Sequence, residues 1–135
     1  MAVPALNPDV AIIHAQQADR RGNVAIWGIT GIQKEEALSA RRVIVTVEEV
    51  VEEFEPRPFQ VVLPWVAVDA ISVVPNGAHP SYAAGYYDRD NAFYGAWDPI
   101  SRDRERFRQW MDEHVLSVEN FAEHTSSIEK KGAMR

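Results

Sequence analysis

The chain contains no cysteine. Disulfide bonds, thiolate catalysis and cysteine-ligated zinc or iron–sulfur sites are therefore excluded. No apolar run approaches the roughly 20 residues that a membrane-spanning helix needs. The amino-terminal stretch Met1–Val10 also lacks the basic start and the apolar core of a signal peptide. These absences lead us to expect a cytoplasmic protein that does not enter a membrane.

Positive charge is also scarce. The 135 residues include 14 Lys and Arg against 20 Asp and Glu, which gives a net charge of −6 and a pI near 5.2. Nucleic acids and anionic membranes both favour a basic surface, so we expect neither as a partner. The hydrophobic fraction of 46% is enough for a packed core. The length fits one domain or part of one.

Several common catalytic motifs are missing as well. The sequence has no Walker A, G-x-S-x-G or G-x-G-x-x-G pattern. Gly28–Gly31 precedes a predicted helix and could hold an anion, but an ordinary strand-to-helix loop is the favoured interpretation. The histidines are far apart and lack metal-ligand spacing, so no metal site is predicted: His14, His79, His114 and His124.

Short β-branched runs dominate the first half of the chain. The Val10–Ala15 run (VAIIHA) is almost wholly apolar, which predicts a strand buried on both faces. A helix is predicted over Gln33–Arg41. The other predicted strands are Val24–Trp27, Arg42–Val51, Val61–Leu63 and Ala70–Val74. This order predicts an α/β fold with an open, mostly parallel sheet and flanking helices.

The second half contains one strongly periodic helix. Ser101–Leu116 carries apolar residues at helical spacing, with Ser101 as the expected N-cap. We predict an α/β part over residues 1–116 and a helical or disordered tail over 117–135. One helix before Ser101 is too little to cover a parallel sheet. The sheet is therefore expected to belong to a larger domain or to be buried against a partner subunit.

An unusual segment, Gly77–Tyr94 (GAHPSYAAGYYDRDNAFY), shows neither helical periodicity nor strand alternation. It is too aromatic for a flexible linker, so an ordered loop of the kind that often carries function is predicted. Its tyrosines could line a pocket or an interface, or could form a small core under the loop. His79 could either hold the loop in place or belong to a site.

Acidic residues gather at the end of the Arg42–Val51 strand. A solvated acidic turn is favoured over a catalytic carboxylate. Glu48 and Glu49 must point to opposite faces of that strand, so one of them is expected to be buried and to need a partner. The candidate partners are Arg20, Arg21, Arg41 and Arg42.

Three separated segments resemble the A (alpha) chain type of family I coenzyme A transferases. They are His14–Gly28 (HAQQADRRGNVAIWG), Lys34–Val51 (KEEALSARRVIVTVEEVV) and Gly77–Trp97. The A-D-x-x-G-N turn and the V-E-E strand end are similar across the family. The PSYAAGYYDRDNAFY loop resembles the glutaconate CoA-transferase type. The resemblance covers only the later half of such an alpha subunit, which implies part of a larger domain.

The resemblance implies a hetero-oligomer with a B (beta) subunit, which supplies the glutamate that forms the acyl intermediate. No residue of this chain matches that glutamate, so no catalytic residue is assigned here. The implied substrates are an acyl-CoA thioester and a carboxylic acid, without a permanently bound cofactor. This chain would form a scaffold and one wall of the cleft between subunits. The candidate cleft or interface residues are Gln16, Asp19, Asn23, His79, Ser81, Tyr82 and Tyr86.

Two alternatives stay open. Some members with this alpha-subunit pattern resemble ring-opening hydrolases of steroid-derived CoA thioesters, which share the fold and differ in reaction. The second alternative is a chain that has no catalytic role and keeps only a surface for assembly.

Overall fold

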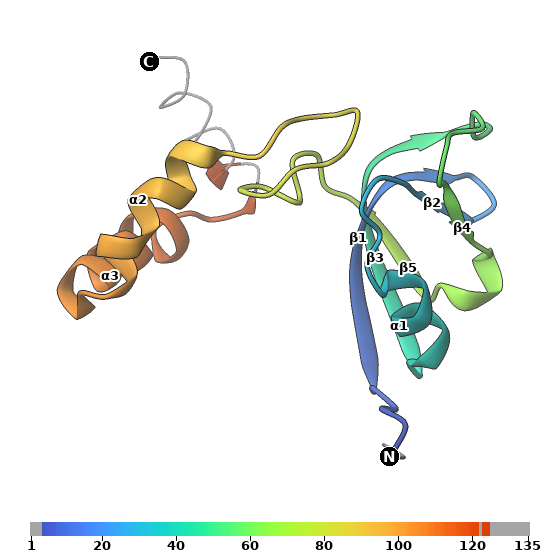
Figure 1. The fold of residues 1–135 in the computed structure, drawn as a ribbon, viewed down its shortest axis with the longest axis horizontal. Helices are drawn as coiled ribbons and strands as arrows, with labels where there is room; N and C mark the ends of the chain where they lie inside the picture. Colours follow the sequence, from blue (N-terminus) through green and yellow to red (C-terminus); the bar gives the residue numbers. More distant parts are fainter. Residues whose placement is uncertain (1–3, 122, 125–135) are drawn as a thin grey trace. The chain divides into compact units, whose positions relative to one another are not determined.

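The computed structural model describes residues 4–121 and 123–124, and the chain divides into two compact units, residues 1–89 and 90–135. The first unit is a five-stranded sheet with one helix (Figure 1). Its strands run in the order β4-β2-β1-β3-β5 across the sheet. Their bounds are β1 Val10–Asp19, β2 Val24–Ile26, β3 Arg42–Val51, β4 Val61–Leu63 and β5 Ala70–Val73.

The predicted α/β class is confirmed, and the sheet is mixed rather than mostly parallel. The central strand β1 pairs in parallel with β3, and β3 pairs in parallel with β5. The β1–β2 and β2–β4 pairings are antiparallel. Strand β1 is also longer than the predicted Val10–Ala15, because it continues through Gln16 and Gln17 to Asp19. Both glutamines are buried, and their amides find partners there.

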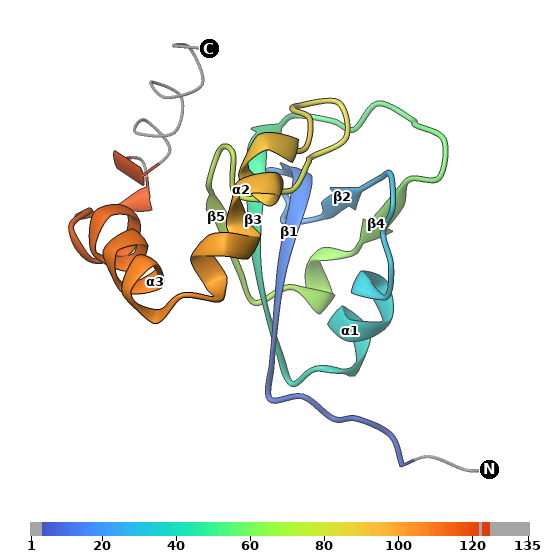
Figure 2. The ribbon, with the colours of Figure 1, turned by 60° about the vertical axis from the view of Figure 1, so that its left-hand side comes forward.

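The core of this unit lies on one face of β1 and β3. Ala11, Ile13 and Ala15 of β1 are buried together with the alternate valines of β3. Helix α1 (Gln33–Ser39) adds Ala37 to the same cluster. Figures 1 and 2 show α1 beside the sheet, where it contacts β1 and β4. Burial of these side chains supplies the main favourable free energy of folding.

The opposite side chains of the same strands are exposed. Ile12 is 70% exposed, and Val10 and Ile44 are exposed as well. The prediction that β1 is buried on both faces is therefore wrong for its first half. The alternation of the pleat explains the pattern, because successive residues point to opposite faces and α1 covers one face. The expectation of an incompletely covered sheet agrees with these exposed side chains.

In the second unit, the prediction of a single helix over Ser101–Leu116 is wrong. Two helices replace it, α2 (Asn91–Ser101) and α3 (Arg104–Met111), and a π-helical turn (Asp112–Leu116) follows α3. Ser101 ends α2 rather than capping a helix. The cap of α3 is Asp103, whose carboxylate accepts the backbone N–H groups of Glu105 and Arg106.

Helix α2 was not expected, and it shortens the predicted irregular segment, which ends at Asp90. The Asp90 carboxylate accepts the N–H of Phe93 and so caps α2. Trp97 of α2 packs edge-to-face on Trp110 of α3, with ring centroids 4.9 Å apart. This contact joins the two helices. Aromatic packing thus outweighs the weak helical propensity that Gly95 and Pro99 give α2.

Among the described residues, no helix combines the length and the apolar character that crossing a membrane requires. The predicted boundary between residues 116 and 117 stays a prediction. Residues 125–135 of the predicted tail lie outside the described residues.

Neighbouring isoleucines on β1 provide a test of the one-sided core. Ile13→Ala removes a side chain that is 2% exposed and should destabilise the chain by about 2–5 kcal/mol. Ile12→Ala removes a side chain that is largely exposed and should change stability by less than about 0.5 kcal/mol. Urea unfolding followed by circular dichroism measures both. Equal losses from the two variants would contradict the one-sided core.

Candidate functional site

A buried carboxylate lies where β1 and β3 approach their carboxyl ends. In the parallel register His14 of β1 stands opposite Thr46 of β3. The His14 Nδ1 lies 2.8 Å from Thr46 Oγ1, and Nε2 lies 2.7 Å from Glu48 Oε1. The Glu48 side chain is only 4% exposed. Because a carboxylate oxygen accepts, His14 Nε2 carries the proton of this bond.

The loop that follows β5 is attached to the same carboxylate. Glu48 Oε2 accepts the Asn76 N–H at 2.7 Å, and Oε1 accepts the Tyr87 hydroxyl at 2.7 Å. The Tyr87 oxygen in turn accepts the Ala78 N–H at 2.8 Å. Burial, followed by the bond to Glu48, raises the pKa of Tyr87. Glu48 therefore connects both ends of the segment 76–87 to the sheet.

Gly77 allows the loop to approach His14 this closely. A Cβ at Gly77 would lie 2.5 Å from His14 Cε1 and 2.9 Å from the Val74 carbonyl oxygen. Neither neighbour is free to move, because the His14 ring is held by Thr46 and Glu48 and the Val74 carbonyl belongs to the backbone. A side chain at position 77 would push the loop off the sheet.

The partners of Glu48 differ from those expected. The structure gives this carboxylate a histidine, a tyrosine and a backbone N–H, so the prediction of an arginine partner is wrong. Arg20 instead pairs with Glu52 at 2.6 Å, and Arg41 approaches Asp9 at 3.6 Å. Both pairs are exposed, and such pairs contribute little to stability.

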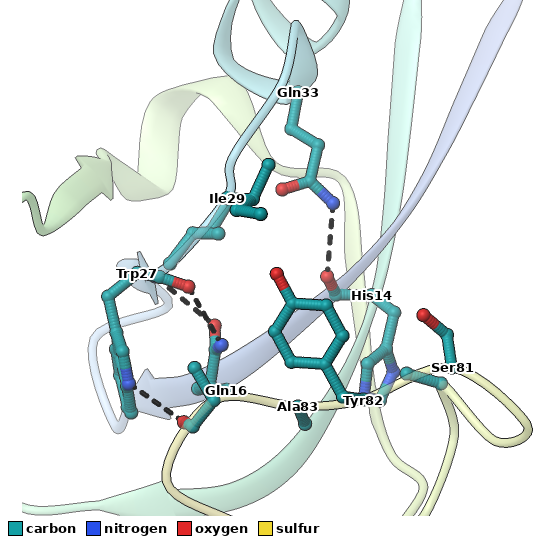
Figure 3. A pocket seen from close by; sticks show the side chains of 11 residues that line it. His14, Gln16, Trp27, Ile29, Gln33, Ser81, Tyr82 and Ala83 are labelled. Atoms are coloured by element: carbon teal, nitrogen blue, oxygen red, sulfur yellow. Dashed lines mark hydrogen bonds between the residues drawn. The ribbon is translucent and has the colours of Figure 1, made fainter. Parts of the chain in front are cut away.

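Trp27, just beyond β2, connects the far part of the loop to β1. Its indole N–H donates to the Ala84 carbonyl at 2.8 Å. The buried Gln16 amide donates to the Trp27 carbonyl at 3.0 Å and accepts the Trp27 N–H at 3.3 Å. Figure 3 shows this reciprocal pair and the indole bond on one side of the site. The loop is thus fixed to the sheet both at Glu48 and at Trp27.

Between these two attachments lies a pocket of about 200 Å³. Side chains of β1, β2, the first turn of α1 and the loop surround it (Figure 3). Its lining residues are His14, Gln16, Ile26, Trp27, Ile29, Gln33, Ala78, Ser81, Tyr82, Ala83 and Ala84. The whole pocket belongs to the first unit. It is the candidate functional site.

The predicted cleft residues divide into three groups. Gln16, Ser81 and Tyr82 line the pocket. His79 lies in the same loop, half-buried, without lining it. The remaining three lie elsewhere in the first unit: Asp19, Asn23 and Tyr86.

Asp19 and Asn23 build the turn between β1 and β2. The Asp19 carboxylate accepts the Asn23 side-chain N–H at 2.7 Å and the Arg21 N–H at 2.9 Å. Burial acts to raise the pKa of Asp19, but the bonds from Asn23 and from the turn N–H groups hold it below its usual value. Asn23 Oδ1 also accepts the Trp65 N–H at 2.9 Å. These bonds support a structural role for the turn.

Tyr86 forms a second carboxylate contact at the end of β3. Its hydroxyl donates to Glu49 Oε1 at 2.5 Å, and the Gln17 amide donates to the same oxygen at 2.9 Å. The bond from Tyr86, followed by that from Gln17, lowers the pKa of Glu49. Burial and the bond to Glu49 raise the pKa of Tyr86 to about 12. Glu48 and Glu49 thus face opposite ways, as predicted, and Glu48 is the buried one.

Among the lining side chains that can form hydrogen bonds, the sequence did not indicate three: His14, Trp27 and Gln33. His14 lies in the middle of β1, and both of its ring nitrogens make hydrogen bonds, to Thr46 and to Glu48. The signal that could have found the site is the parallel pairing of β1 with β3, which brings His14 beside Glu48. In the described part of the chain, no group of His, Asp and Glu has the arrangement of a metal site.

A sequence model of the family described as "Coenzyme A transferase" matches residues 1–74. The chain is 56% identical, over 94% of its length, to the alpha-type chain of the 3-oxoadipate CoA-transferase of Pseudomonas knackmussii. It is 40% identical over its full length to the corresponding chain of the glutaconate CoA-transferase of Acidaminococcus fermentans. The crystal structure of that glutaconate coenzyme A-transferase matches 93% of the chain with a TM-score of 0.82.

A more distant relative is the cholesterol ring-cleaving hydrolase subunit of Rhodococcus jostii, which is 31% identical over 91% of the chain. The chain spans less than half the length of all these relatives: 45%, 42% and 46%. It covers 40% of the glutaconate coenzyme A-transferase chain in the crystal structure.

Tyr87→Phe tests the connection between the loop and Glu48. The variant removes the donor to Glu48 and leaves the Ala78 N–H without its acceptor, which should cost about 1–3 kcal/mol. Tyr82→Phe is the matched control, because the Tyr82 hydroxyl has no hydrogen-bond partner among residues 4–121, and it should cost less than about 0.5 kcal/mol. Urea unfolding compares the two. A Tyr87 variant as stable as the control would refute the connection.

Tyr86→Phe tests the lowered pKa of Glu49. A carboxyl whose pKa is lower in the folded state adds stability above its ordinary value of 4.5, and that stability disappears as the pH falls through the folded value. Without the Tyr86 hydroxyl, the pKa of Glu49 should rise toward 4.5. Carbon-detected NMR titration of the Glu49 carboxyl measures the change. An unchanged midpoint would show that Tyr86 does not stabilise the carboxylate.

Proposed function

Because the chain belongs to the coenzyme A transferase family, we propose that it is the later half of an alpha subunit that moves CoA between an acyl-CoA and a carboxylic acid. Its partner is a beta subunit, which supplies the reactive glutamate. The substrate pair to test first includes 3-oxoadipate, since the relative named for that acid is 56% identical to this chain over 127 aligned residues. Coenzyme A enters as part of the substrate and is not retained as a cofactor.

The observation that carries the proposal is the agreement of the two named transferases over nearly the whole chain. Their identities of 56% and 40% exceed the 31% found with the ring-cleaving hydrolase subunit. A TM-score of 0.82 at 39% identity extends the likeness to the backbone. Transfer is therefore favoured over ring-opening hydrolysis.

The contacts of Glu48 are those of a structural carboxylate, which agrees with a reactive glutamate that lies on another chain. A carboxylate that attacks a thioester needs a free oxygen lone pair aimed at the substrate. Three of the roughly four lone-pair sites of Glu48 accept hydrogen bonds, from Asn76, His14 and Tyr87. The side chain is also only 4% exposed and does not line the pocket. These hydrogen bonds hold the carboxylate in place and stabilise its charged form. Its role is to position the loop beside the pocket.

The exposed face of β1 and β3 supports a share in a larger assembly. Ile12 and Ile44 occupy adjacent register positions on that face, and both are exposed. Contiguous apolar side chains of this kind on a sheet commonly mark a surface that another segment covers. The remaining length of the longer relatives, or the beta subunit, would provide that cover.

The test is a CoA-exchange assay on the chain joined to the upstream half of the protein and co-expressed with its beta subunit. An acyl-CoA donor and 3-oxoadipate are supplied, and the thioesters are separated by chromatography. Turnover should be at least about tenfold faster with the acceptor acid than without it, a difference of roughly 1.4 kcal/mol. Turnover that is independent of the acceptor would identify a hydrolase and contradict the proposal.

A parallel assay omits the upstream half. If the chain exchanges CoA when only the beta subunit is added, the later half is sufficient by itself. If only the extended chain is active, the later half needs the earlier half, as the exposed sheet face leads us to expect. No exchange in either form would support the alternative of an assembly surface without catalysis.

A further inference from the structure

The pocket between Trp27 and Tyr82 carries no fixed charge. In the described chain, none of its lining residues is Lys, Arg, Asp or Glu. Its one imidazole, His14, already uses both ring nitrogens, one beside Thr46 and one donating to Glu48. A carboxylate or phosphate that entered the pocket would lose hydration without gaining a cation. The pocket therefore disfavours anions.

The walls of the pocket suit an extended ligand in which apolar groups alternate with hydrogen-bonding groups. Ile26, Trp27 and Ile29 are the large apolar side chains of the lining, and three alanines add to its apolar part. The hydroxyls of Ser81 and Tyr82 have no hydrogen-bond partner within the described part of the chain, so each can still donate and accept. Figure 3 shows the Tyr82 hydroxyl pointing toward the Gln33 end of the pocket. Small-molecule binding sites generally have this composition, apolar walls with a few placed polar groups.

The volume limits what can enter. At about 200 Å³ the pocket is smaller than the roughly 300–1,000 Å³ of sites that enclose a whole drug-sized ligand. It can hold one segment of a longer molecule, with the rest outside. An acyl-CoA consists of three such segments: a nucleotide with phosphates, an uncharged pantetheine arm with two amides and a hydroxyl, and the acyl group.

We propose that the pocket binds the pantetheine arm of a CoA thioester, with Ser81 and Tyr82 bonding its amide or hydroxyl groups. The nucleotide is excluded by its phosphates. The acyl groups of 3-oxoadipate and glutaconate are excluded because each retains a second carboxylate. This assignment rests on the proposed function, since only that function brings a CoA thioester to the chain. It gives the loop 76–87 a task, which is to present two hydroxyls to the arm.

The probe is the indole N–H of Trp27 in a ¹H–¹⁵N correlation spectrum. The chain has four tryptophans, and a Trp27→Phe variant identifies the signal. This N–H donates to Ala84 of the pocket wall, so a ligand in the pocket should shift it. Pantetheine should shift the signal to saturation, and glutarate, a dicarboxylate of similar length to the acyl groups, should not. No response to pantetheine, or tighter binding of glutarate, would overturn the assignment.

Two variants locate the binding. Ser81→Phe places a bulky ring in the lining of the pocket and should weaken pantetheine binding at least about tenfold. Asp88→Phe, at the exposed position that directly follows the loop and lies outside the lining, is the matched control and should leave binding unchanged. Equal binding by the Ser81 and Asp88 variants would show that the arm binds elsewhere.

A third variant tests the hydroxyl itself. Tyr82→Phe deletes only that group and should weaken binding about two- to tenfold without lowering stability. Unchanged binding by this variant would remove Tyr82 from the assignment.

The binding assay and the exchange assay test the two proposals independently of each other. If pantetheine shifts Trp27 and Ser81→Phe abolishes the shift while no exchange occurs, the pocket assignment stands and the transferase proposal fails. If exchange occurs but Trp27 does not respond, only the pocket assignment fails. In an active assembly Ser81→Phe should raise KM for the acyl-CoA and leave KM for the acceptor acid unchanged.

Discussion

The buried carboxylate of Glu48 is the interaction on which the site depends. It accepts three donors, from a neighbouring strand (His14), from the start of the loop (Asn76) and from its end (Tyr87). A buried carboxylate is costly unless its oxygens are hydrogen-bonded, and a charge-assisted bond is stronger than a neutral one. These three bonds offset the cost of burying the carboxylate, and they have a second effect. They fix where a segment with little regular secondary structure lies against the sheet.

The position of the loop decides the shape of the pocket. One wall consists of β1, β2 and α1, which the buried core of the first unit holds rigid. The other wall is the loop, which has few buried side chains of its own besides Ala83. Its hydrogen bonds to Glu48 and from Trp27 hold it in place where it has no apolar core of its own. A loop held by specific polar contacts can present Ser81 and Tyr82 at a fixed distance from the opposite wall, which a flexible loop cannot do.

The sequence allowed the strands and the family resemblance to be predicted, since both depend on local patterns. Strand β3 was predicted with its observed bounds because its β-branched residues form one continuous run. The opposition of Glu48 and Glu49 followed from the pleat. The partners of Glu48 could not be predicted, because they come from positions up to 39 residues away that only the tertiary fold brings together. Helix α2 was missed for a related reason, as its stability comes from packing against α3 rather than from its own composition.

Amide hydrogen exchange at the two ends of the loop tests the central claim most directly. The Asn76 N–H donates to Glu48, and the Ala78 N–H donates to Tyr87, which in turn donates to Glu48. If the carboxylate makes the loop part of the sheet, both amides should exchange about as slowly as the backbone amides of β3. Exchange of Asn76 and Ala78 at the rate of exposed loop amides, with β3 still protected, would contradict the account.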